Sequence, residues 1–108
     1  MTDKFYSLLG LAVRAGKVSF GHDAAKQSIR CRKAYFMLFT SDASGRLRDE
    51  MRGLAPALTV YELDMDSHQA ALHFGKRAAV MTINDANFSD AMKKSIPAAE
   101  KKEETQCL

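Results

Sequence analysis

The amino-acid sequence predicts an α/β fold, a three-layer α/β/α sandwich with a central mixed sheet of about four strands. Short apolar segments alternate along its 108 residues with amphipathic segments whose apolar residues recur at helical spacing. Such alternation favours a parallel or mixed sheet with helices on both faces. Residues 34–40 are nearly all apolar or aromatic, which is typical of a central strand covered on both faces.

The first predicted helix and the segment after it have clear boundaries. Thr2 or Asp3 can cap the helix, and Gly16 suits the left-handed position that ends it. The apolar stripe of this helix comprises Phe5, Leu8, Leu9, Ala12 and Val13. Val18 and Phe20 then alternate with polar neighbours, which predicts a short strand.

A second predicted helix opens at Gly21 and covers about residues 22–32. Its inward side comprises Ala25, Ser28, Ile29 and Arg32. Lys26, Arg30 and Lys33 are spaced by four and three residues, so we expect them to line another side together. The start of a helix leaves backbone N–H groups unpaired, and glycine there lets a partner approach closely. This stretch is therefore a candidate site for a phosphate backbone.

Capping residues and helix breakers place the later elements. Their predicted caps are Ser41, Asp42 or Ser44 for the third helix, Asp66 or Ser67 for the fourth, and Asn84 or Asp85 for the fifth. Their predicted ends are Pro56, Gly75 and Pro97. Leu47, Met51 and Leu54 should face inward from the third helix. Residues 57–63 and 78–83 are the remaining predicted strands.

Composition indicates one domain over residues 1–97, followed by a charged tail over residues 98–108 that has little to bury and is expected to be disordered. No apolar run approaches the roughly 20 residues of a membrane span. The two cysteines, Cys31 and Cys107, are not expected to form a disulfide, which favours a reducing cytoplasm. Cys31 should be a partly buried small residue and Cys107 an exposed thiol.

Basic charge is concentrated at the beginning of the chain. Residues 1–36 have a net charge of +5, residues 37–75 of −3 and residues 76–108 of +1. A polyanion-binding face requires such a concentration, but an unevenly charged solvated surface would produce it too. Composition leaves both interpretations open.

The sequence contains no set of residues typical of catalysis. It has no P-loop and no dinucleotide-binding glycine fingerprint. The histidines, His22, His68 and His73, do not match a metal-binding spacing, and we expect no cofactor. Asp42, Asp64 and Asp66 could suggest a phospho-receiver domain, but the first strand is not followed by an acidic pair. We interpret the aspartates as helix caps and predict that the protein is not an enzyme.

Several segments resemble one family. They are residues 8–17 (Leu-Leu-Gly-Leu-Ala-Val-Arg-Ala-Gly-Lys), Gly21 with the helix after it, residues 41–44, residues 72–80 and residues 83–88. Together they resemble the YlxQ-like bacterial branch of the kink-turn-binding ribosomal-protein family, over about residues 4–96. The resemblance implies an RNA-binding-type α/β/α domain that binds structured RNA without catalysis. It also implies that the start of the second helix contacts phosphates and sheared purine pairs, while a loop before the last strand covers a flipped-out base.

The chain departs from the family pattern directly after Gly21. Kink-turn binders have Asn and Glu two and three positions after this glycine, where this chain has Asp23 and Ala24. Gln27 stands where the family has Lys, with Lys26 just before it. An ionised Asp accepts hydrogen bonds but is repelled by phosphate, and Ala24 cannot reach a base edge. We therefore expect weaker base readout with phosphate attraction retained.

The leading hypothesis is a monomeric, non-catalytic RNA-binding protein associated with the ribosome or with translation. The alternative is a protein-interaction module of the same fold whose RNA site has weakened. The predicted RNA-binding residues are Lys17, Gly21, His22, Asp23, Lys26, Gln27, Arg30, Lys33, Lys76 and Arg77. Charge reversal at Lys26 and Arg30 should abolish RNA binding under the first hypothesis and change little under the second.

Overall fold

The computed structural model describes residues 2–96, in which helices and strands alternate as predicted. The elements are α1 (Asp3–Arg14), β1 (Val18–Phe20), α2 (His22–Arg30), β2 (Phe36–Phe39), α3 (Gly45–Leu54), β3 (Val60–Glu62), α4 (Ser67–Phe74), β4 (Val80–Ile83) and α5 (Ala86–Lys94). The predicted helix end at Pro97, the predicted tail and Cys107 lie outside the described residues.

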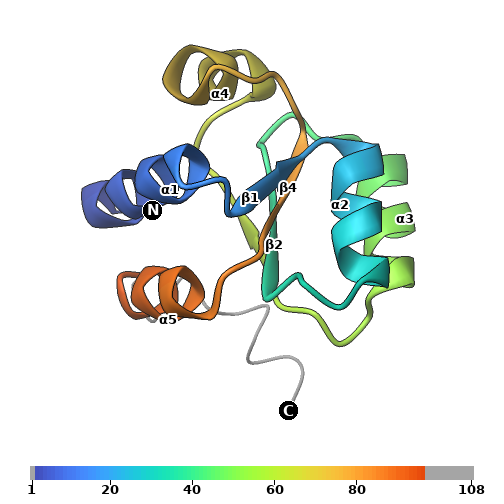
Figure 1. Ribbon diagram of the computed structural model, residues 1–108. Helices are drawn as coiled ribbons and strands as arrows, with labels where there is room; N and C mark the ends of the chain where they lie inside the picture. The colour runs from blue at the N-terminus through green and yellow to red at the C-terminus, as the bar shows by residue number, and fades with distance from the viewer. Residues whose placement is uncertain (1, 97–108) are drawn as a thin grey trace.

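The four strands form a mixed sheet in the order β1-β4-β2-β3. β2 and β3 are parallel, while β4 is antiparallel to both of its neighbours, β1 and β2. Figure 1 shows α1, α4 and α5 on one side of this sheet and α2 and α3 on the other. The predicted fold class, an α/β/α sandwich with a mixed sheet, is confirmed.

The central strand β2 supplies side chains to a core on each face of the sheet. Phe36 and Leu38 pack in the core beneath α1 and α5, whereas Met37 and Phe39 pack in the core beneath α2 and α3. All four side chains are fully buried, as expected for alternating directions in a strand covered on both faces. The apolar run in the sequence is nearly unbroken because both faces of this strand are covered.

Two helices end in the same hydrogen-bonded turn, although the sequence predicted only one of these ends. After α1, Gly16 has φ 72° and the Lys17 N–H donates to the Ala12 carbonyl. After α2, Arg32 has φ 58° and the Lys33 N–H donates to the Ser28 carbonyl. Both are Schellman turns, in which the left-handed position usually holds glycine. Because an arginine in the sequence does not indicate a left-handed helix end, α2 was predicted about two residues too long.

Among the alternative caps that the sequence predicted, Ser44 caps α3 and Asp85 caps α5. Asp42 and Asn84 make other hydrogen bonds. Two burial predictions were wrong, because Leu54, the last residue of α3, and Cys31, which follows α2, are exposed rather than inward or partly buried. The strand predicted over residues 57–63 is shortened to β3 by a turn before Val60.

Two polar side chains join the loops around the sheet. The Asp42 carboxylate accepts hydrogen bonds from the Thr40 hydroxyl at 2.6 Å and from the Ser67 hydroxyl and N–H at 2.7 and 2.9 Å. It therefore ties the end of β2 to the start of α4, and these bonds lower its pKa to about 2.

Arg48 of α3 is the second of these side chains. Its guanidinium donates to the Ala43 and Thr40 carbonyls at 3.0 and 3.1 Å and pairs with Glu62 at 2.6 Å. It also lies 5.4 Å from the centroid of the Phe39 ring. Arg48 thus links α3, the loop after β2 and the edge strand β3.

Candidate nucleic-acid interface

The start of α2 is open to solvent. Gly21 has φ 90° and ψ 170°, a conformation essentially restricted to glycine. Its N–H donates to the Val80 carbonyl at 2.9 Å, which fixes it against β4. A Cβ atom at this position would meet nothing within 4 Å. No side chain caps α2, whereas Thr2, Ser44, Asp66 and Asp85 cap the other helices of residues 2–96.

The basic turn between α4 and β4 lies beside this helix start. Lys76 Nζ is 5.6 Å from the centroid of the Phe20 ring, and Phe20 directly precedes Gly21. Arg77 is exposed in the same turn. Two segments that are more than fifty residues apart in the sequence are therefore brought together.

The basic side chains of α2 nearest to Gly21 lie against carboxylates. His22 Nε2 lies 2.8 Å from Glu50 Oε2, and its Nδ1 lies 3.3 Å from Asp23 Oδ1. Lys26 Nζ lies 3.9 Å from the same Glu50 oxygen. Hydrogen bonding to Glu50 and then to Asp23 raises the pKa of His22, while hydrogen bonding to His22 lowers the pKa of Glu50. Glu50 thus offsets positive charge at the helix start.

The remaining predicted cations lie at the other end of α2. Arg30 ends this helix, which is about 13 Å long at 1.5 Å per residue. Lys33 lies beyond the helix, so its place in the predicted stripe was wrong, whereas Lys26 and Arg30 lie four residues apart on α2. Lys17 lies at the far end of β1 from Gly21, where its carbonyl accepts from the Asn84 N–H. Gln27 is exposed, and its side-chain amide donates to Cys31 Sγ at 3.4 Å.

A polar network holds this far end together. Asn84 Oδ1 accepts from the Ser28 hydroxyl of α2 and from the Thr82 hydroxyl of β4, and Asn84 Nδ2 donates to Ser19 Oγ of β1 at 2.8 Å. The Ser28 and Thr82 side chains are buried. Asn84 therefore joins α2 to two strands and fixes the end of α2 relative to Lys17.

Sequence reasoning missed two residues that shape the interface. Glu50 is twenty-eight residues from His22, and nothing in its local sequence predicts their contact. Tyr35 was assigned to a buried run, but its side chain is 47% exposed. Arg32 and Lys33, just before Tyr35, could have indicated that the chain is still at the surface at this point.

The described residues contain no cluster of three or more His, Cys, Asp or Glu side chains that could hold a metal ion. His68 and His73 are both exposed on α4, as predicted. Within residues 2–96, each helix is too short or too polar to cross a lipid bilayer. The arrangement offers hydrogen-bond donors and positive charge to an anionic partner.

Comparison with known proteins supports the fold. No family model and no curated protein matches the chain. A solved structure described as a protein with unknown function from Bacillus halodurans is similar, with a TM-score of 0.76 and 22% sequence identity. The similarity covers 86% of this chain and 96% of that chain. At this identity the likeness establishes the fold alone, and the resemblance to the kink-turn-binding family stays a prediction.

Proposed function

We propose that the protein binds structured RNA without catalysing a reaction on it, as a component associated with the ribosome or with translation. The observation that carries this proposal is the placement of Lys76 against Phe20, next to the uncapped start of α2, with Arg77 exposed in the same turn. Backbone N–H groups and flexible cations converge there on one open surface, which suits contacts to several phosphates of a folded RNA.

The pairing of Glu50 with His22 and Lys26 favours a second candidate function. A carboxylate that already occupies these cations reduces their attraction for phosphate. A protein-interaction module of the same fold, with a weakened RNA site, accounts for this pairing as well. The two candidate functions differ in the effect that replacing Lys76 and Arg77 by neutral residues has on RNA binding.

The test is a fluorescence titration of a structured RNA at several salt concentrations. Replacing Lys76 and Arg77 by Gln should weaken binding and reduce the slope of log affinity against log salt by about 2, because each phosphate contact contributes about 0.9. The matched control replaces Lys4 and Lys94, two exposed lysines of α1 and α5, by Gln.

The proposal requires the control variant to bind like the wild type. Absence of binding to any structured RNA at low salt, or an affinity indifferent to salt, would overturn it. Equal losses in the two variants would show non-specific attraction and favour the protein-interaction module.

A further inference from the structure

The turn between α2 and β2 carries a cluster of positive charge. Arg30, Arg32 and Lys33 are all exposed. Among residues 2–96, no carboxylate lies within ion-pair distance of these three side chains, in contrast to Lys26 and His22 at the other end of α2. The strongest unpaired basic surface of α2 is therefore at its end and not at its start.

An exposed aromatic residue, Tyr35, follows this charge two residues after Lys33. The Tyr35 N–H donates to the Ile83 carbonyl at 2.8 Å, so its backbone is held at the beginning of β2. Its side chain nevertheless remains 47% exposed. Exposed aromatic rings interleaved with arginine and lysine are the features by which proteins stack unpaired bases and follow a single strand.

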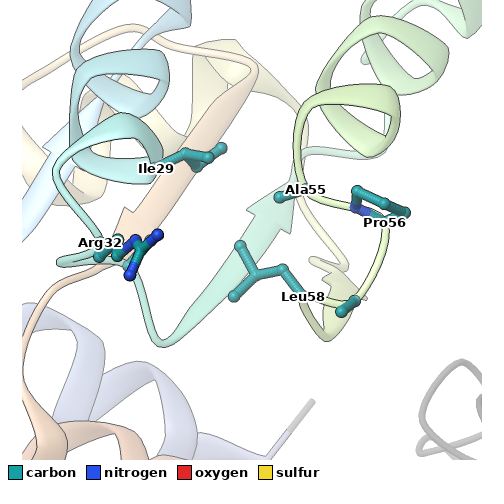
Figure 2. A pocket seen from close by; sticks show the side chains of 7 residues that line it. Ile29, Arg32, Ala55, Pro56 and Leu58 are labelled. Atoms are coloured by element: carbon teal, nitrogen blue, oxygen red, sulfur yellow. The ribbon is translucent and has the colours of Figure 1, made fainter.

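A pocket of about 360 Å³ opens at the same turn. It is lined by Ile29, Arg32, Ala34, Ala55, Pro56, Ala57 and Leu58. Figure 2 shows Arg32 on one side of this pocket, with Pro56 and Leu58 on the other. Arg32 is the charged residue among these lining residues of the described chain, and the left-handed backbone conformation of the Schellman turn sets the direction of its side chain.

We propose that the α2–β2 surface, defined as Arg30, Arg32, Lys33, Tyr35 and this pocket, binds a single-stranded RNA segment. The cations contact its phosphates, while the Tyr35 ring and the pocket receive unpaired bases. Charge complementarity favours a polyanion, and the flat exposed ring with an apolar pocket favours one that carries bases. This inference rests on the proposed function and adds a second contact, one length of α2 away from the helix start.

The experiment compares a hairpin RNA that carries a short unpaired extension with the same hairpin lacking it. In the test variant, Arg30→Gln, Arg32→Asn and Lys33→Gln are combined, because Asn tolerates the left-handed conformation at position 32. The salt slope for the extended RNA should fall by about 2, since each single-strand phosphate contact contributes about 0.7. The matched control replaces three exposed cations outside this surface, Lys4, Arg14 and Lys94, by Gln.

Tyr35 provides a second test that does not change charge. Tyr35→Ala should weaken binding of the extended RNA by about 5- to 150-fold, the range for loss of one stacked base. Tyr35→Phe retains the ring and should bind like the wild type. Neither change should affect the hairpin without the extension.

The outcomes separate the two proposals. If the wild type binds the bare hairpin but gains nothing from the extension, the inference about the α2–β2 surface fails and the proposed function stands. If neither RNA binds, the proposed function fails. If an oligoglutamate peptide binds this surface as tightly as the extended RNA, its partner is an acidic protein segment and the inference is wrong.

Discussion

Replacement of Asn84 by Ala is the sharpest test of how the interface is held together. The Asn84 side chain accepts hydrogen bonds from the Ser28 and Thr82 hydroxyls and donates one to Ser19. Ala removes all three bonds. It leaves the hydroxyls of Ser28 and Thr82, residues that are 4% and 0% exposed, without this acceptor.

The expected loss in the free energy of unfolding follows from the hydroxyls of Ser28 and Thr82 that lose their acceptor. A buried polar group that loses its partner costs about 1–3 kcal/mol. Ser28 can turn its hydroxyl to a carbonyl one turn earlier in α2, which limits the total to about 2–4 kcal/mol. For a domain of this size, such a loss lowers Tm by roughly 10–30 °C.

Urea and thermal unfolding followed by circular dichroism would measure this cost. The matched control is Asn87→Ala, an exposed position of α5, which should change stability by less than about 0.5 kcal/mol. Adding Ser28→Ala to the Asn84→Ala variant should cost less than the two single changes together, because the stranded hydroxyl is removed with its acceptor. A stability of Asn84→Ala within about 0.5 kcal/mol of the wild type would refute this reasoning.

Three further predictions concern charged side chains. Arg48→Ala should destabilise the fold by about 2–4 kcal/mol through lost carbonyl and ring contacts, whereas Arg46→Ala, exposed on the same helix, should be nearly neutral in urea unfolding. The hydrogen-bonded Asp42 has its pKa lowered from 3.8 to about 2, so its stabilisation is present above pH 4 and lost as the pH falls toward 2. In a pH series of unfolding measurements, Asp42→Asn should therefore lose less stability between pH 4 and pH 2 than the wild type. An equal loss in the two proteins would exclude this role. Because Glu50 raises the pKa of His22, the contribution of that pair is complete below pH 6.5 and is lost as the pH rises through the raised value. Glu50→Gln should lower the titration midpoint of His22 measured by NMR and tighten RNA binding, and a midpoint identical to that of the wild type would contradict the contact.

The predictable part of the fold depended on local signals. The caps at Thr2 and Asp66 and the left-handed glycines at positions 16 and 75 lie within a few residues of the ends that they define. The buried run before Thr40 identified the central strand because a strand covered on both faces needs no polar side. The end of α2 escaped prediction because Arg32 occupies a position where glycine is the usual signal.

The sequence by itself determined the order of helices and strands, the class of fold and the concentration of basic residues around the second helix. Only the tertiary structure decided how that charge is divided. Glu50, brought in by α3, lies against His22 and Lys26 at the start of α2, whereas within residues 2–96 no carboxylate pairs with the basic residues at its end. Ion pairs depend on distances of a few ångströms between residues that are far apart in the chain, and spacing along one helix carries no record of them.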